Sequence, residues 1–401
     1  MTLPLLVRKS LRQHALSTVV TVGSIALAAG LWLAVWVLQE QSHRAFTGVN
    51  SGFDAVLGAR GSKLQLVLNA VFHLEASPGN LTWSDYLEIK NNPNVSLAVP
   101  LAVGDNYRGY RLVGTMPELF ERAEYMPGKK FTVEPDGRLF ESGYRETVVG
   151  AFAARKLNLK VGDQFHPFHG LIFDEKNQHS ETYVVVGVLK PSNTPADRVL
   201  WIPLEGIQNM SGHDPNTATD VSAVLVALRS PTAGFLMDLM YNKQGTRLTF
   251  AWPVGQIVTQ LFDKVGWFEQ VLRLTAGLVA LVALAAVFVG IYNSMHARRR
   301  DIAILRALGA RRGTVFGAVV AEAAVITALG VLAGGVVYAV IVSIAAAIVR
   351  ERTGVVLEPF AFSPVFLWAP PVMIFFGALA GVLPAFKAYR TEIATHLAPI
   401  S

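Results

Sequence analysis

The chain has 401 residues, of which 52% are hydrophobic and 16% are charged, and its mean hydropathy is +0.39. Soluble domains carry about 25% charged residues, so this composition argues against a wholly soluble protein and favours a membrane protein. The absence of cysteine excludes disulfide bonds, thiol catalysis and a lipid-modified N-terminal cysteine, and leaves any metal site to histidine and carboxylate ligands.

Basic residues beside apolar segments account for much of the net charge of +6, so we expect no nucleic-acid partner. Residues 1–14 hold Arg8, Lys9 and Arg12 among leucines, which predicts a short interfacial helix on the cytoplasmic side of a membrane. Residues 15–38 lack charge and are long enough to cross a bilayer as the first transmembrane helix, TM1.

Two features of the first span leave alternatives open. A signal peptide cleaved near Ala26-Leu27-Ala28 competes with an uncleaved span, and the apolar run that continues beyond this point favours the span. Small residues lie close to one face of the helix, where they suit either a dimer contact or packing within one subunit. These residues are Gly23, Ala26, Ala29 and Gly30.

Residues 39–267 are polar and predict an α+β domain, with a stalk, outside the cytoplasm. Helices are expected at 62–72, 83–90 and 151–160. Strands are expected where β-branched and apolar residues cluster between turn signals. These segments are 96–103, 110–115, 147–150, 181–189, 198–202 and 221–228. Residues 165–180 are expected to form an extended loop.

Residues 268–295 form the second span, TM2, and apolar residues at helical spacing within 256–273 predict that this helix continues beyond the membrane as a stalk. Residues 314–349 form TM3, which is longer than one bilayer crossing and predicts a kink or break near Gly334-Gly335. Glu322 is the charged residue within TM3. It is expected either to pair with an arginine near the inner interface or to serve a function within the membrane.

An outer loop at 350–363 and a fourth span, TM4, at 364–386 complete the membrane part, with a kink or reset expected at Pro370-Pro371. Residues 387–401 return a basic tail to the cytoplasm. The predicted fold class is a membrane α-helical protein of four transmembrane helices, with a large extracytoplasmic α+β domain inserted between helices 1 and 2. Both termini are expected in the cytoplasm and the large domain outside it, and the family resemblance given below implies that the membrane is the bacterial inner membrane and that the large domain is periplasmic.

Residues 296–313 lie between TM2 and TM3 and carry six arginines, so this short segment should face the cytoplasm. Apolar residues at helical spacing predict an amphipathic helix that ends at Gly309, although a solvated loop that only sets topology is the simpler alternative. The run Arg298-Arg299-Arg300-Asp301-Ile302-Ala303-Ile304-Leu305-Arg306-Ala307-Leu308-Gly309-Ala310 resembles the cytoplasmic signature of FtsX/MacB-type ABC transporter permeases. In that family the segment helps to seat the permease on its ATPase.

The outer domain resembles the MacB-type periplasmic core more loosely. Its short motifs follow the family order, and the order is more informative than any single motif. These motifs are Val113-Gly114-Thr115, Gly137-Arg138-Leu139-Phe140, Val148-Val149-Gly150 with Ala154 and Leu157, Gly162-Asp163, and 184–187. At the C-terminal end, Pro384-Ala385 with Ala388 and Arg390 resembles the closing motif of the family. The segments 58–72 and 165–180 depart from the pattern.

The resemblance implies a non-enzymatic permease that acts as a homodimer and transmits ATP-driven movement from a separate ABC ATP-binding subunit, which would hold ATP and Mg²⁺. The chain lacks the G-x-x-x-x-G-K-[ST] motif of a P-loop, and no cofactor is expected on it. The implied coupling residues are Arg298, Arg299, Arg300, Asp301, Ile302, Ile304, Leu305, Arg306, Leu308 and Gly309.

The cargo implied by the resemblance is a lipoprotein, a peptide or a hydrophobic compound, and a periplasmic adaptor is a further partner. The alternatives are an FtsX-like regulator of a periplasmic cell-wall hydrolase, a metal-related envelope transport component, and a membrane enzyme or sensor that acts alone. The last is disfavoured because no catalytic motif such as G-x-S-x-G or H-E-x-x-H occurs.

Six of the nine histidines lie in the outer region. They are His43, His73, His166, His169, His179 and His213. His166, His169 and His179, with Asp163 and Asp174, are candidate ligands for a divalent metal ion such as zinc. Histidines on a solvated loop are the alternative, and spacing within a loop does not define geometry, so the sequence assigns no firm metal site.

Overall fold

The computed structural model describes residues 3–47, 52–212, 218–297, 310–353, 357–358 and 360–389. The chain divides into two compact units. The helical unit comprises Met1–Gln41, Gly266–Ala347 and Glu358–Ser401, and the sheet domain comprises Ser42–Val265 and Ile348–Leu357. Each unit is described by itself.

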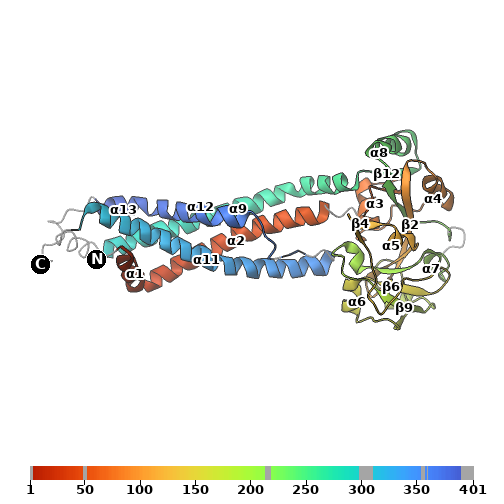
Figure 1. Cartoon of the computed structure of the whole chain (residues 1–401), viewed down its shortest axis with the longest axis horizontal. Coiled ribbons are helices and arrows are strands. Elements are labelled where there is room, and N and C mark those ends of the chain that lie inside the picture. Colours follow the sequence, from red (N-terminus) through yellow and green to blue (C-terminus); the bar gives the residue numbers. More distant parts are fainter. Residues whose placement is uncertain are drawn as a thin grey trace. The chain divides into compact units, whose positions relative to one another are not determined.

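Long apolar helices build the helical unit (Figure 1). Its elements are α1 (Leu3–Gln13), α2 (Ala15–Thr47), α9 (Val254–Ala297), α11 (Arg312–Thr353), α12 (Val365–Ala380) and α13 (Val382–Tyr389), of which α2, α9 and α11 extend beyond the unit. Among the described residues, four segments are long and apolar enough to cross a membrane: Ala15–Gln41, Gln270–Asn293, Arg312–Glu351 and Val365–Phe386. The predicted fold class, four spans with a large domain between the first two, is therefore confirmed.

Small residues let α2 and α11 approach closely. A Cβ added at Gly30 would lie 2.6 Å from Cβ of Val337, and one added at Gly334 would lie 2.9 Å from Cβ of Ala29. The small face of the first span thus packs against the third span of the same chain, whereas Gly23 has nothing within 4 Å of its added Cβ. This arrangement favours the intrasubunit explanation for the small residues.

Two interruptions were predicted within the third and fourth spans. Of the kink or break expected near Gly334-Gly335, the break is wrong, because α11 is one helix through both glycines and Gly334 serves the close contact with α2. The fourth span is continuous through Pro370 and Pro371 and is interrupted at Gly381, between α12 and α13. Prolines are tolerated within membrane helices when neighbouring groups satisfy the freed backbone carbonyls.

A mixed sheet forms the core of the sheet domain, with strand order β12-β1-β11-β2-β3-β10-β6-β9-β7 and with β8 paired to β2. Its strands are β1 (Ala55–Ala59), β2 (Val95–Tyr107), β3 (Tyr110–Thr115), β6 (Glu146–Val149), β7 (Gln164–Phe165), β8 (Phe168–His169), β9 (Tyr183–Val188), β10 (Leu200–Pro203), β11 (Ala223–Leu228) and β12 (Leu248–Ala251). A separate hairpin joins β4 (Glu124–Met126) and β5 (Lys129–Lys130).

The sheet carries an apolar layer on each face, because successive strand residues point to opposite sides. Leu112 belongs to one layer and Val113 to the other, and both are fully buried. The first layer packs under α4 (Trp83–Lys90), α6 (Ala151–Leu157), α7 (Leu204–Gln208) and α8 (Pro231–Asp238). The second packs under α3 (Lys63–Ala70), α5 (Glu118–Glu121) and the start of α9.

Most of the expected elements of this domain are present, including the helix at Trp83–Lys90 and the strand at Tyr110–Thr115. The expected loop at 165–180 also contains β8 and a short 3₁₀ turn at Glu175–Asn177, so its description as an extended loop is wrong in part. Strands β1 and β12 were not anticipated. They pair with each other, and β1 also pairs with β11.

His73 lies just after α3 and carries an expected pH dependence. Its backbone has a positive φ of 54°, and its ring packs edge-on against Trp201 with ring centroids 5.4 Å apart. Burial, together with the nearby charge of Arg111, lowers the pKa of His73 to about 3. The native state therefore holds this imidazole neutral at pH values where the unfolded chain would protonate it.

We expect His73 to make the sheet domain less stable in acid. The unfolded pKa of about 6.5 lies above the native pKa, so stability is full above pH 6.5 and falls by about 1.4 kcal/mol per pH unit below it. The variant His73→Asn, which tolerates a positive φ, should flatten this slope. Thermal unfolding of both proteins between pH 7 and pH 4.5 measures the difference, and parallel curves would contradict the assignment.

Candidate functional site

The predicted ATPase contact lies between two described helices. The coupling residues Arg298 to Gly309 are outside the described residues, so their contacts stay a prediction. The structure describes the helices that enter and leave this segment: α9 ends at Ala297 and α11 begins at Arg312. These helices are 44 and 42 residues long, and each continues into the sheet domain.

The first turns of α9 are part of the core of the sheet domain. The side chains of Val254, Ile257 and Val258 are buried in the apolar layer beneath α3 and α5. The backbone N–H of Val254 donates to the carbonyl of Asp54, 3.0 Å away. Asp54 directly precedes β1, so this bond joins the start of the helix to the start of that strand. The stalk predicted before TM2 is thus a helix that begins inside the sheet domain.

The last turns of α11 also belong to the sheet domain, which the sequence did not predict. The Glu351 carboxylate forms an ion pair with Lys156 of α6, with 2.8 Å between Oε1 and Nζ. The backbone carbonyl of Glu351 accepts a hydrogen bond from the Arg198 guanidinium. The guanidinium of Arg350 lies 5.9 Å from the ring centre of Phe152, also on α6. The exposed ion pair adds little stability by itself, but several contacts converge on one turn of helix.

Glu322 of α11 is buried in the helical unit, where the hydroxyl of Ser10 on α1 donates to its carboxylate. Ser10 and Val7 lie one turn apart on the buried face of α1, whereas Arg8 and Lys9 are exposed, as expected for an interfacial helix. The predicted alternative was an arginine of the loop, and four of the six loop arginines, Arg298, Arg299, Arg300 and Arg306, lie outside the described residues. The contact with Ser10 supports a structural role for Glu322, which is to hold α1 against the third span.

We expect Glu322→Gln to preserve this contact, because the amide oxygen still accepts from Ser10. Glu322→Leu should leave the Ser10 hydroxyl buried without its acceptor and lower stability by about 1–3 kcal/mol. Thermal unfolding of the detergent-solubilised variants measures the difference. If the Glu322→Gln protein is stable but the ATPase activity of its complex with the partner subunit falls strongly, the result would instead indicate proton coupling.

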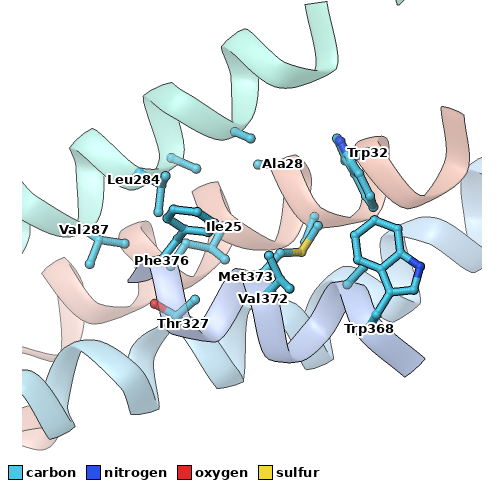
Figure 2. Close-up of a pocket in the computed structure, with 14 residues that line it drawn as sticks. Ile25, Ala28, Trp32, Leu284, Val287, Thr327, Trp368, Val372, Met373 and Phe376 are labelled. Carbon is cyan, nitrogen blue, oxygen red and sulfur yellow. The ribbon is translucent and has the colours of Figure 1, made fainter. Parts of the chain in front are cut away.

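The helical unit also contains an apolar cavity of about 180 Å³, lined by residues of all four spans (Figure 2). Trp32 and Trp368 close one end of it in an edge-to-face contact, with ring centroids 5.6 Å apart. The Thr327 hydroxyl in its wall donates to the carbonyl of Ala323 at 2.8 Å and is therefore directed to its own helix. An acyl chain or another apolar group fits this lining better than a polar solute.

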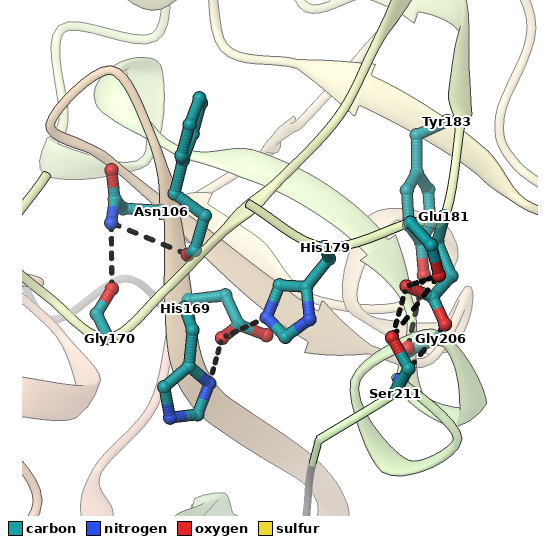
Figure 3. A network of polar contacts seen from close by, with 11 residues as sticks. Asn106, His169, Gly170, His179, Glu181, Tyr183, Gly206 and Ser211 are labelled. Carbon is teal, nitrogen blue, oxygen red and sulfur yellow. Dashed lines mark hydrogen bonds and ion pairs between the residues drawn. The ribbon is translucent and has the colours of Figure 1, made fainter. Parts of the chain in front are cut away.

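The sheet domain brings two of the predicted histidines together with an aspartate that the sequence did not single out (Figure 3). Oδ1 of Asp105 lies 3.3 Å from Nδ1 of His169 and 3.2 Å from Nε2 of His179. Asp105 lies on β2, just after a bulge at Gly104 that shifts the register against β3. Such a bulge changes the side of the sheet to which the following residue points.

Hydrogen bonds to backbone carbonyls fix the chain at both histidines. Nδ2 of Asn106 donates to the carbonyls of Phe168 and Gly170, at 3.4 and 2.8 Å, and so holds the chain on both sides of His169. The backbone N–H of His179 donates to the carbonyl of Pro167 at 2.9 Å. Figure 3 shows both imidazoles directed at the same carboxylate.

The other candidate ligands make different contacts and are not part of this cluster. Nδ1 of His166 lies 3.1 Å from the carbonyl of Glu181. Asp163 accepts from the backbone of Lys160, and Asp174 caps the short turn that contains Lys176. His213 lies outside the described residues, and the side chain of His43 is likewise not described.

A second polar contact next to this cluster anchors the chain at Ser211 (Figure 3). The backbone N–H and the hydroxyl of Ser211 each donate to the Glu181 carboxylate at 2.9 Å. Burial tends to raise the pKa of Glu181, but these hydrogen bonds outweigh it, and the net pKa lies below its usual value. Glu181 therefore carries its charge at neutral pH and is satisfied by protein donors.

Comparison with known proteins gives matches along most of the chain. A family profile described as the MacB-like periplasmic core domain matches residues 18–234, and one described as the FtsX-like permease C-terminal matches residues 273–393. The uncharacterized ABC transporter permease YvrN of Bacillus subtilis is 25% identical over 252 residues, which cover 59% of this chain and 59% of that permease. The match thus spans about three fifths of the length of that relative.

Two solved structures are similar to parts of the chain. The extracellular domain of the noncanonic ABC-type transporter YknZ from Gram-positive bacteria has 21% identity and a TM-score of 0.31, covering 49% of this chain and 98% of the other. The periplasmic region of MacB from Actinobacillus actinomycetemcomitans has 14% identity and a TM-score of 0.35, covering 54% of this chain and 94% of the other.

Proposed function

Because the chain belongs to the FtsX/MacB-type family of ABC transporter permeases, we propose that it transmits movement from a separate cytoplasmic ATPase to its sheet domain. The sheet domain would lie in the periplasm, the termini and the Arg298–Gly309 segment in the cytoplasm, and the spans in the inner membrane. ATP and Mg²⁺ would be held by the ATPase, since this chain has no P-loop motif.

The observation that carries this proposal is the continuity of two helices. Both helices that flank the arginine-rich segment run without interruption into the sheet domain, where α9 contributes core residues and α11 contacts α6. A continuous helix transmits displacement along its length better than a flexible linker does. A shift imposed at the cytoplasmic ends would therefore move the two attachment points in the sheet domain.

The apolar lining of the cavity argues against a polar solute that is conducted through the four helices. The cargo is therefore expected to be moved by the sheet domain, outside the membrane. A lipoprotein, a peptide or a hydrophobic compound fits this mechanism. The working unit is expected to be a homodimer, as the family resemblance implies. Regulation of a periplasmic cell-wall hydrolase uses the same movement and differs in the partner of the sheet domain.

Affinity isolation from the native host tests the proposal. The full-length chain, carrying a tag without histidines, is solubilised in detergent and its partners are identified by mass spectrometry, with an unrelated tagged membrane protein as control. A P-loop ATPase recovered as a separate chain in near-equal amount is the expected result. A lipoprotein or a hydrolase in the same eluate would identify the cargo or the regulated partner, and recovery of the chain alone would contradict the proposal.

A further inference from the structure

We propose that Asp105, His169 and His179 form a binding site for a divalent transition-metal ion, with Zn²⁺ as the ion that best fits the ligands. The site lies wholly in the sheet domain and does not depend on the proposed coupling to an ATPase. One side of it is open to solvent, because the His169 side chain is 54% exposed while that of Asp105 is fully buried.

The separations among the donor atoms fit a metal ion. Two ligands that are each about 2.1 Å from a tetrahedral ion lie about 3.4 Å apart. The Asp105 carboxylate oxygen lies 3.3 Å from the His169 nitrogen and 3.2 Å from the His179 nitrogen, and all three donors lie within 4.8 Å of one another. An ion placed between them would keep one coordination position open toward solvent.

The chemistry of the donors selects the class of ion. Two imidazoles and one carboxylate suit zinc and its neighbours in the first transition row, whereas Ca²⁺ and Mg²⁺ prefer sites built from oxygen. The chain contains no cysteine, so a thiolate site that would compete for zinc is absent from it. Cu²⁺ binds such ligands at least as tightly as Zn²⁺ does, so Cu²⁺ is titrated in parallel.

Residues next to the three ligands hold those ligands in position. Asn106 follows Asp105 on β2 and donates to the carbonyls on either side of His169, so one short segment sets both ligands. The β2–β8 pairing places Asp105 directly opposite His169. Ligands positioned in this way bind an ion with little reorganisation.

A metal-free ion pair is the competing explanation, because a His–Asp hydrogen bond has a similar length. The two explanations differ in whether the imidazole nitrogens that face Asp105 carry protons. In an ion pair, both ring nitrogens that face Asp105 must carry a proton, whereas metal ligands present lone pairs and release protons on binding.

The test uses the full-length detergent-solubilised chain with a tag that contains no histidine. The protein is stripped with EDTA and titrated with Zn²⁺ against a chelating dye, with Cu²⁺ and Ca²⁺ in parallel titrations. We expect one Zn²⁺ per chain, proton release on binding, and no competition from Ca²⁺. Replacing Zn²⁺ by Co²⁺ should give the visible absorption of a four-coordinate ion.

Matched variants identify the ligands. His169→Gln should weaken Zn²⁺ binding by about 100-fold, and its exposure keeps the fold unaffected. Asp105→Asn should weaken it at least as much, with folding checked by circular dichroism. His166→Gln is the control, because its ring contacts the Glu181 carbonyl instead of the cluster. Absence of bound Zn²⁺, or an equal loss in His166→Gln, would overturn the proposal.

Discussion

Charge reversal at Arg299 and Arg306 is expected to release the ATPase while leaving the permease folded in the membrane. Truncation of a buried, hydrogen-bonded charge at a protein interface costs about 2–5 kcal/mol of binding free energy, and reversal of the charge adds repulsion. The double variant Arg299→Glu/Arg306→Glu should therefore bind the ATPase at least about 100-fold more weakly. Co-purification from detergent, with the amount of each chain measured, gives the result.

Two controls separate this effect from expression and topology. The variant Arg108→Glu/Lys129→Glu makes the same change in charge at two exposed residues of the sheet domain and should retain the ATPase. The variant Arg299→Lys/Arg306→Lys keeps the positive charge that orients the segment, and it should bind with intermediate strength. Full recovery of the ATPase with the Glu variant would show that this segment does not form the contact.

Substitution of Gly334 by leucine is expected to disrupt the packing of the first and third spans. A Cβ at this position would already lie 2.9 Å from Cβ of Ala29 and 3.1 Å from the carbonyl of Ala26. Since α2 and α11 cannot separate without losing neighbouring contacts, such as Gly330 against Ile25, we expect a loss of about 1–3 kcal/mol or more.

Gly335 provides the matched control, because nothing lies within 4 Å of a Cβ built there. Both variants add the same side chain at adjacent positions of one helix, so helix propensity and hydrophobicity are nearly equal. Thermal unfolding in detergent should show a clear drop in melting temperature for Gly334→Leu and little change for Gly335→Leu. Equal melting temperatures would contradict the close approach of the two helices.

The sequence predicted the elements whose signals are local. The strand at Tyr110–Thr115 and the helix at Trp83–Lys90, which Thr82 and Asp85 cap reciprocally, follow from alternation and capping residues within a few positions. Strand β1 is five residues long, and its partners β11 and β12 come much later in the chain. This strand forms through pairing with distant parts of the chain, so no local sequence pattern predicts it.

The length of the spans was predicted less well than their number. Alanine- and glycine-rich sequence near Gly334 predicted a break, but a glycine in a membrane helix also permits close packing, and only the neighbouring helix decides between these effects. The continuation of α11 to Thr353 likewise depends on contacts of Arg350 and Glu351 with α6.

The candidate metal ligands were predicted in part. His169 and His179 were selected by residue type, but His166 stands in the same short segment and contacts a backbone carbonyl instead. Asp105 was missed because the expected strand ended at Val103, before the bulge that directs this carboxylate toward the histidines. The run Gly104-Asp105 within an apolar strand was the available signal, since a glycine inside a strand often marks a bulge.

The most direct test of coupling measures movement of the sheet domain when the ATPase binds nucleotide. Because the chain has no cysteine, Glu88→Cys on the exposed side of α4 introduces a single spin-label site. Pulsed electron spin resonance then gives the label-to-label distance between the two copies in the isolated complex. We predict a distance distribution that changes between the nucleotide-free and ATP-bound states and stays fixed in the Arg299→Glu/Arg306→Glu variant. Identical distributions with and without ATP, in a complex that retains its ATPase, would contradict the account.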